Sequence, residues 1–264
     1  MESARSKLAI AEPAAASLRL KILTINTHKG FTTFNRRFVL HELRDAVRDT
    51  AADIVCLQEV LGSHAAHASA HPNWPSEPHY EFLAGSIWGN VAYGRNAVYT
   101  EGHHGNAVLS KFPIVHWHNH DISSGASEER GLLHCVLQPP APSPPIHVIC
   151  THLALREAER ALQARHLREL IAREVPADAP LLVAGDFNDW RNRLNDVLTQ
   201  QNHLAEAFEQ AHGRVARSFP ARLPILRLDR IYFRNATLQH AAVLSAQPWS
   251  RLSDHAALTA ELSL

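Results

Sequence analysis

The sequence has few cysteines and no long apolar run, and both absences exclude classes of protein. Its 264 residues include three cysteines, Cys56, Cys135 and Cys150. Each stands inside an apolar segment, which is typical of buried thiols and not of a disulfide framework or a zinc cluster. The N-terminus has no continuous apolar stretch of signal-peptide type, and no later segment is long enough to span a membrane. We therefore expect a soluble, cytoplasmic protein.

The chain also lacks an excess of charge of either sign. Basic and acidic residues number 26 each, so net charge does not attract nucleic acid or an anionic membrane, although a local basic cleft is possible. Histidine is abundant, at 19 residues. Three of these, His64, His67 and His71, recur at near-helical spacing, but no acid or cysteine lies among them. We interpret residues 62–78 as a solvated loop rather than a metal site.

Apolar periodicity predicts many strands and few helices. Strands are predicted at residues 18–26, 53–60, 80–85, 96–100, 105–118, 130–137, 146–153, 179–188, 227–235, 238–246 and 255–264. Helices are predicted at residues 36–52, at residues 156–174 and from about Arg191. In the 156–174 helix the expected inner side chains are those of Ala161, Leu162, Leu167, Leu170 and Ile171.

This order of elements predicts an α+β fold. Strand-rich stretches with well-separated helices favour layered sheets over a strictly alternating βαβ pattern. The sequence shows no internal linker and no short repeat. We therefore expect one domain over residues 18–264, preceded by a flexible leader at residues 1–17, and a monomer.

Polar side chains stand at the ends of six predicted strands. They are Asn26, Gln58 with Glu59, Thr151 with His152, Asp186 with Asn188, Asp229, and Asp254 with His255. Each alone is ordinary, since an aspartate after a strand is more often a turn or cap residue than a catalytic acid. Ligand sites in layered α/β proteins gather where strands end and loops begin, so the set predicts one convergent site.

The residue types at these ends indicate a hard metal ion and acid–base chemistry. The candidate metal ligands are Asn26 and Glu59, with Asp254 as a third. Oxygen donors without a thiolate cluster favour Mg²⁺, or Mn²⁺, over zinc. Carboxylates and imidazoles beside such an ion suit hydrolysis of a phosphate ester, in which water attacks in line.

Seven short motifs carry a family resemblance. In chain order they are "TIN" (24–26), "LQE" (57–59), "GNAVLSKFPI" (105–114), "THL" (151–153), "GDFN" (185–188), "LDRIYF" (228–233) and "SDH" (253–255). With these motifs the sequence resembles the endonuclease/exonuclease/phosphatase superfamily, which includes DNase I-like nucleases, sphingomyelinases and deadenylases. The resemblance implies a DNase I-like four-layer αββα sandwich with two mixed β-sheets.

The resemblance also implies roles for the metal side of the site. Glu59 would be the principal Mg²⁺ ligand, with Asn26 beside it and Asp254 completing the coordination directly or through water. Asp186 would position or deprotonate the attacking water, and Asn188 would hold a phosphate oxygen.

Three further roles follow from the same resemblance. His255 would contact the phosphate as a cation that Asp229 keeps charged and oriented, because a nearby carboxylate favours the protonated imidazole. His152 would stabilise the transition state or assist the leaving oxygen. Arg130 is either a substrate contact or an ordinary surface arginine.

The substrate is the least determined part of the prediction. The "THL" motif is closer to sphingomyelinases, deadenylases and DNase I than to abasic-site endonucleases. We rank a nucleic-acid phosphodiester first, a phospholipid headgroup second and a small phosphorylated metabolite third. A non-catalytic scaffold is disfavoured because every site position holds a competent residue. A basic groove would favour nucleic acid and an apolar rim near Trp74 or Trp249 would favour lipid, although we interpret Trp249 and Trp190 as packing residues.

Overall fold

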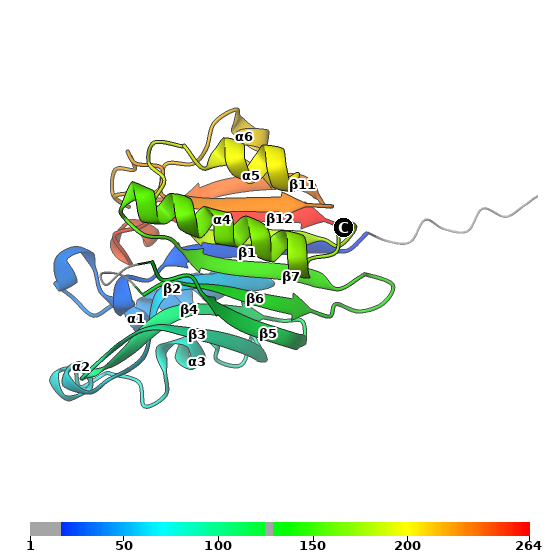
Figure 1. Cartoon of the computed structure of the whole chain (residues 1–264). Helices are drawn as coiled ribbons and strands as arrows, with labels where there is room; N and C mark the ends of the chain where they lie inside the picture. The colour runs from blue at the N-terminus through cyan, green and yellow to red at the C-terminus, as the bar shows by residue number, and fades with distance from the viewer. Residues whose placement is uncertain (1–16, 125–128) are drawn as a thin grey trace, which may run out of the picture.

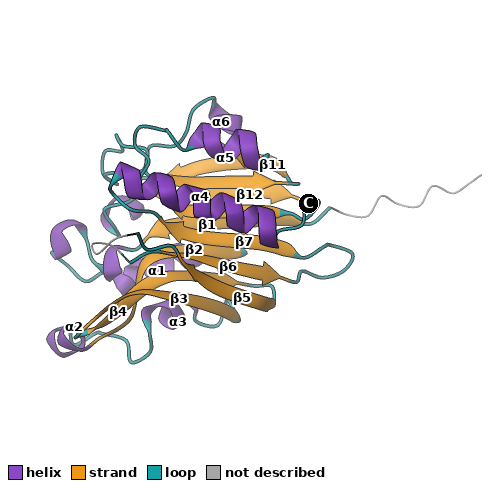
Figure 2. Cartoon of the chain, viewed as in Figure 1, coloured by secondary structure: helices purple, strands orange, loops and turns teal. Residues whose placement is uncertain are grey.

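Two six-stranded sheets lie face to face, with helices on their outer faces, in the computed structural model (Figures 1 and 2). The structure describes residues 17–124 and 129–264. The predicted leader therefore lies outside the described residues, apart from Ser17. The layered α+β sandwich that the sequence predicts is confirmed, while the extent of the domain stays a prediction.

The first sheet has the strand order β11-β12-β1-β2-β4-β3. Its strands are β1 (Arg19–Asn26), β2 (Ile54–His64), β3 (Asn90–Tyr99), β4 (Gly102–Ser110), β11 (Thr237–Leu244) and β12 (Ala257–Ser263). Strands β1 and β2 are parallel, and the other neighbours are antiparallel.

The second sheet has the order β5-β6-β7-β8-β10-β9. Its strands are β5 (Ile114–Asp121), β6 (Gly131–Leu137), β7 (Ile146–His152), β8 (Leu181–Asp186), β9 (Ala205–Glu206) and β10 (Asp229–Arg234). Here β7 and β8 are the parallel pair. Each sheet thus has one parallel pair among antiparallel neighbours, as a mixed sheet does.

Helices cover the outer faces and edges. They are α1 (Leu40–Asp49), α2 (Ala65–Ala70), α3 (His79–Ala84), α4 (Glu157–Glu174), α5 (Asn195–Asn202) and α6 (Ala207–His212), with short 3-10 helices η1 (His28–Gly30), η2 (Thr33–Asn35) and η3 (Trp249–Arg251). Side chains of α1 and α3 pack on the first sheet, and those of α4 and α5 pack on the second. Among the described helices, none is both long and apolar enough to cross a membrane.

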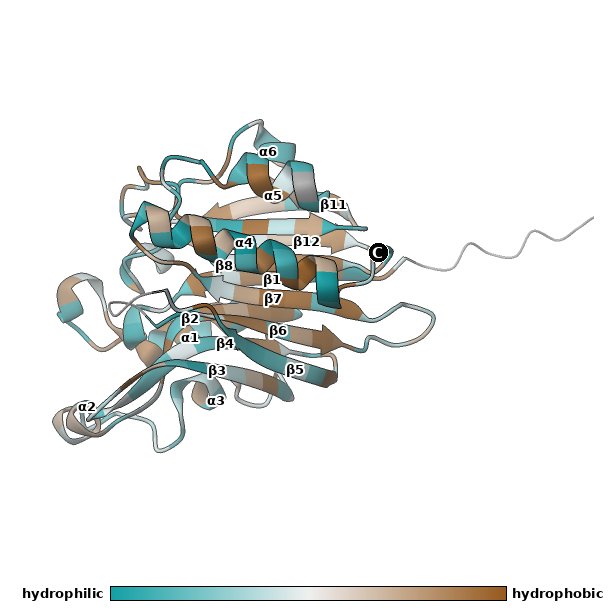
Figure 3. Cartoon of the chain, in the orientation of Figure 1, coloured by the Kyte–Doolittle hydropathy of each residue, from teal (hydrophilic) through white to brown (hydrophobic). Residues whose placement is uncertain are grey.

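The central strands are apolar on both faces because both faces are covered. In β2, Cys56 points into the core between the sheets, whereas Leu57 packs with the helices outside. Alternate residues of β7 and β8 divide in the same way, and Figure 3 shows the resulting apolar colouring along β7. All three cysteines are buried free thiols in the inter-sheet core, as predicted.

The predicted strand at residues 80–85 is wrong, because this segment is α3. Pro78 precedes the helix, and the proline ring fixes a φ that suits a helix start. The helix buries Phe82 and Leu83 against the first sheet. A short apolar run fits a helix as well as a strand, and here packing against the outer face of the first sheet selects the helix.

The predicted loop at residues 62–78 is wrong in its first part. Strand β2 continues to His64, where it pairs with Gly102 of β4, and α2 follows directly. The His64 side chain accepts a hydrogen bond from the His67 backbone nitrogen and so caps α2. Strand β4 offers hydrogen-bonding partners over this length, which the local composition does not reveal.

The predicted helix at residues 156–174 is confirmed as α4, but Ala161 and Leu162 do not belong to its buried face. Arg160 and Gln163 are buried instead. The Arg160 guanidinium donates to the backbone oxygens of Ala154 and Leu155, and these hydrogen bonds allow an arginine to occupy the buried face of the helix. The other helices are shorter than predicted, since α1 covers residues 40–49 and α5 begins at Asn195, not Arg191.

Gly185 lets β7 and β8 approach closely where the site begins. It lies opposite Thr151, one position before the pair His152 and Asp186. Its φ is +149°, and a Cβ atom there would lie 1.9 Å from the Thr151 backbone oxygen. Only glycine fits this position, so the "GD" of the motif fixes where the Asp186 carboxylate stands.

We expect Gly185→Ala to lower the free energy of unfolding by about 1–3 kcal/mol, because the added methyl group must displace backbone in a packed interior. Equilibrium urea unfolding measures this change. Gly89→Ala is the control, since its Cβ would meet no atom within 4 Å. Equal stability of the Gly185→Ala and Gly89→Ala proteins would contradict the steric role of Gly185.

Candidate active site

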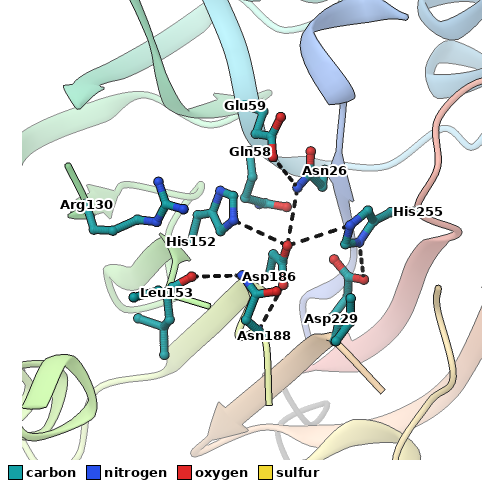
Figure 4. A network of polar contacts seen from close by, with 12 residues as sticks. Asn26, Gln58, Glu59, Arg130, His152, Leu153, Asp186, Asn188, Asp229 and His255 are labelled. Carbon is teal, nitrogen blue, oxygen red and sulfur yellow. Dashed lines mark hydrogen bonds and ion pairs between the residues drawn. The ribbon is translucent and has the colours of Figure 1, made fainter. Parts of the chain in front are cut away.

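The structure brings most of the predicted polar strand ends together at one edge of the sandwich (Figure 4). They are Asn26 of β1, Glu59 of β2, His152 of β7, Asp186 of β8, Asp229 of β10 and His255 just before β12. In each sheet the two parallel strands carry their carboxyl ends to the same edge. Strand β10 runs antiparallel to β8, so its first residue lies beside the last residue of β8.

The carboxylate of Asp186 lies at the centre of this group and is 1% exposed. Its Oδ2 accepts a hydrogen bond from Asn26 Nδ2 at 3.2 Å and lies 3.4 Å from His152 Nε2. The same oxygen lies 3.8 Å from His255 Nε2. Its Oδ1 accepts a hydrogen bond from the Asn188 backbone nitrogen at 2.9 Å. One buried carboxylate thus contacts residues from both sheets.

His255 and Asp229 form a buried ion pair. His255 Nδ1 donates to Asp229 Oδ2 at 2.8 Å. Burial alone would lower the pKa of His255, but the carboxylates of Asp229 and Asp186 raise it to about 10. Burial raises the pKa of Asp186 to about 6, a rise that the charge of His255 limits. At neutral pH His255 is therefore a cation beside a carboxylate that is ionised but basic enough to accept a proton.

Glu59 is held in a strained position by a β-bulge in β2. The register with β4 shifts between Leu57 and Val60, and Glu59 has a φ of +52°. Its Oε1 accepts a hydrogen bond from Asn26 Nδ2 at 3.1 Å. Although burial favours the protonated form, His152 where it is protonated in acid, the Lys29 ammonium and the Asn26 hydrogen bond lower the pKa of Glu59 to about 2. The carboxylate is therefore ionised.

The oxygen donors fit a hard divalent cation such as Mg²⁺. Glu59 supplies an ionised carboxylate, and Asp186 supplies a second carboxylate that Asn26 links to the first. The Asn26 oxygen accepts from the His28 backbone nitrogen at 3.0 Å, so its nitrogen faces the carboxylates. Asp254 contacts His28 and Ser253 rather than Glu59. Its place as a metal ligand stays a prediction.

Two more predicted residues border the site. Asn188 has a φ of +50°, and its Nδ2 donates to the Leu153 backbone oxygen at 2.8 Å. Arg130 lines the same pocket as Glu59 and His152. Burial lowers the pKa of His152 well below its usual range, so its imidazole is uncharged at neutral pH. An uncharged imidazole can donate one hydrogen bond to a substrate oxygen.

The pocket over these groups has a volume of about 440 Å³ and an apolar wall. Leu155, Trp190 and Leu226 line it, and they are 65%, 45% and 37% exposed. Leu223 and Ile225 are exposed in the same loop as Leu226. We call these five residues the apolar rim. The interpretation of Trp190 as a packing residue is wrong, whereas Trp249 does pack in the core.

A second hollow, of about 520 Å³, adjoins the site near Ser253. It is lined by Arg36, Arg37, Arg222 and Arg251 together with hydroxyl groups of Thr32 and Thr33. We call this the arginine hollow. The sequence left a local basic cleft open, but the four arginines come from three separate segments of the chain. Only the packing of those segments reveals that they share one hollow.

A sequence profile of the endonuclease/exonuclease/phosphatase family matches residues 23–255, and the chain belongs to this family. Members of the family hydrolyse phosphate esters, so this chain is a hydrolase of phosphate ester bonds. The chain is 57% identical over 244 residues to the protein named "Uncharacterized protein YbhP" of Escherichia coli K12, which covers 92% of this chain and 96% of that protein. The predicted family is thereby confirmed.

Solved structures share the fold. A Beutenbergia cavernae endonuclease/exonuclease/phosphatase matches 93% of this chain and 72% of its own, with a TM-score of 0.73 and 19% identity. D. rerio TDP2 complexed with a single-strand DNA product matches 93% and 99%, with a TM-score of 0.70 and 18% identity. Mannosyl-6-phosphatase Bt3783 of Bacteroides thetaiotaomicron matches 93% and 100%, with a TM-score of 0.71 and 15% identity.

We expect Asp229→Asn to lower the alkaline limit of activity. With the role that the resemblance implies for protonated His255, the rate falls as pH rises through the His255 pKa, which the lost carboxylate no longer raises. A nearby opposite charge typically moves a pKa by about 1–3 units, so the alkaline limb should move down by about that much. Rates of bis(p-nitrophenyl) phosphate hydrolysis from pH 6 to 10.5 measure it. The exposed Asp178→Asn is the control, and an unmoved limb in Asp229→Asn would contradict the role of the pair.

Proposed function

We propose that this protein is a Mg²⁺-dependent phosphodiesterase. The observation that carries the proposal is the buried Asp186 carboxylate, which lies within 3.8 Å of one cationic and one neutral imidazole and shares Asn26 with ionised Glu59. A Mg²⁺ ion held by Glu59 would neutralise charge on the phosphate oxygens. Mn²⁺ suits the same donors. The assigned roles of these residues are part of the proposal.

The protein side chains supply the remaining chemistry. Asp186 accepts a proton from water as the water oxygen attacks phosphorus, and the bond from phosphorus to the leaving oxygen breaks. His255, cationic beside Asp229, stabilises the negative charge that builds on the phosphoryl oxygens. His152 donates a hydrogen bond on the leaving-group side, and Asn188 holds a phosphate oxygen through its amide. These are the roles that the family resemblance implies, and the distances around Asp186 support them.

A diester suits the site better than a monoester because two different surfaces adjoin the phosphate position. The apolar rim borders it on one side, and the arginine hollow adjoins it near Ser253. A phosphate with two substituents can contact both surfaces. A monoester would use only one of them.

The apolar rim changes the order of substrate classes that the sequence favours. We place a phospholipid first, since exposed Leu155, Trp190 and Leu226 at the mouth can enter a lipid surface while the arginines attract anionic headgroups. Nucleic acid is the second candidate, which the arginine hollow supports. The fold shared with TDP2 in complex with single-strand DNA is consistent with it. That the protein is a cytoplasmic monomer stays a prediction.

We expect hydrolysis of bis(p-nitrophenyl) phosphate to require Mg²⁺ or Mn²⁺ and to stop with EDTA. Asp186→Ala should lower the rate by about 100-fold or more, because it removes the general base. Glu59→Gln should raise the Mg²⁺ concentration for half-maximal activity by at least about tenfold, because it removes a charged ligand.

Exposed Asp178→Ala is the control and should keep the rate of the unmodified protein. The same assays with p-nitrophenyl phosphate compare diester with monoester. Full activity in EDTA, or in purified and folded Asp186→Ala, would refute the proposed chemistry. Preference for p-nitrophenyl phosphate would identify a monoesterase.

The double variant Leu155→Ser/Leu226→Ser separates lipid from nucleic acid. Each leucine that becomes buried in the lipid contributes about 1.5 kcal/mol or more to insertion. We therefore expect the double variant to hydrolyse phosphatidylglycerol in vesicles at least about tenfold more slowly. Hydrolysis of bis(p-nitrophenyl) phosphate, which requires no insertion into a lipid surface, should fall by a smaller factor than hydrolysis of the vesicles. Arg36→Ala/Arg222→Ala is the companion variant for a single-stranded DNA substrate. Cleavage of DNA, with loss only in the arginine variant and no action on vesicles, would favour nucleic acid instead.

A further inference from the structure

A cluster of imidazoles lies on the outer face of the second sheet, away from the active site. His120 of β5 and His134 of β6 stand on the face that α4 covers, and Glu174 ends α4 beside them. His147 of β7 contacts His134. His147 and the active-site His152 are five residues apart in β7, or about 17 Å at the usual rise per residue. The cluster is therefore separate from the active site.

The distances in this cluster suit a tetrahedral metal ion. Glu174 Oε2 lies 3.2 Å from His120 Nε2 and 3.4 Å from His134 Nδ1. All three atoms lie within 4.8 Å of one another. Two donors at zinc–nitrogen bond lengths in a tetrahedral arrangement are about 3.3 Å apart. Two of the three separations thus already match a bound zinc ion.

Hydrogen bonding leaves electron pairs directed at the same point. His134 Nε2 lies 2.9 Å from His147 Nδ1, and a proton on this Nε2 leaves a lone pair on Nδ1 toward Glu174. The buried Nε2 atom of His120 faces the Glu174 carboxylate at 3.2 Å but does not meet it in good hydrogen-bond geometry.

We propose that His120 Nε2, His134 Nδ1 and Glu174 Oε2 bind a zinc-class divalent ion, with a fourth position open to water. Two imidazoles and one carboxylate form a ligand set of the kind that zinc takes in proteins. In this tautomer His147 Nδ1 accepts a hydrogen bond from the Nε2–H group of His134, which fixes the ring orientation as outer-shell partners of metal ligands do.

The ion would join the end of α4 to an edge strand. β5 is the outermost strand of the second sheet, and Glu174 is the last residue of α4. An ion that binds only the folded protein stabilises it in proportion to the logarithm of its concentration above Kd. The site is thus a clamp between helix and sheet edge, independent of the hydrolytic chemistry.

Isothermal titration with Zn²⁺ tests this site in full-length protein stripped by EDTA. The Glu59→Gln/Asp186→Asn variant serves as the background, because it also removes a member of the active-site cluster of Asp186, Asp229 and His255. We expect one equivalent of Zn²⁺ to bind, the melting temperature to rise, and Co²⁺ to give the visible absorption of a tetrahedral site. Adding His120→Ala or Glu174→Gln should weaken binding by at least about tenfold.

His116→Ala is the matched control, because His116 is exposed on the same strand and is not a proposed ligand. It should leave zinc binding unchanged, and circular dichroism checks that each variant is folded. Equal zinc affinity in His120→Ala would overturn the proposal. So would zinc binding that is present in the unmodified protein but absent from the Glu59→Gln/Asp186→Asn background, which would place the ion in the active site. Absence of zinc binding would also overturn the proposal and would mean that hydrogen bonds alone hold the cluster together.

Discussion

The placement of one buried carboxylate between two sheets is the constraint on which the active site depends. Asp186 belongs to the second sheet, and its hydrogen bond from Asn26 comes from the first. Asn26 Nδ2 also donates to Glu59, so one amide links carboxylates of both sheets. Packed sheets lie about 10 Å apart, which leaves room for such a link only where side chains from both reach across. The apolar core therefore sets the distance between the carboxylates of Glu59 and Asp186.

Placing three carboxylates in so small a space would be unfavourable without compensation. The cation of His255 lies between Asp229 and Asp186 and stabilises both carboxylates. The strand backbone adds strain, since Glu59 and Asn188 have positive φ values and Gly185 replaces a side chain that would clash with β7. Such strain persists only where surrounding structure over-determines it. The folded sandwich thus holds the site in a geometry that its local sequence would not choose.

The sequence predicted the site better than its surroundings. Asn26, His152 and Asp186 are the last residues of their strands. Parallel neighbours end at the same edge of a sheet, so the positions of these residues in the sequence were enough to predict that they lie close together. Residues 80–85 were mispredicted because a short apolar run does not distinguish a helix from a strand. The apolar rim was missed because the sequence does not show that no other segment packs over the side chains of Leu155 and Trp190. Arg160 was missed because its burial depends on two backbone oxygens that only the fold brings near.

The histidines show why composition alone could not assign chemistry. His255 faces two carboxylates and is held as a cation, whereas His152, although close to the same Asp186, is kept neutral by burial. His134 is also neutral, but its neighbours are an imidazole and a carboxylate that direct electron pairs at one point. The same side chain is therefore charged at one position and uncharged at two others according to what surrounds it, and the role we propose for it differs accordingly. The number of histidines does not distinguish these cases, whereas the distances from each imidazole to its neighbours do.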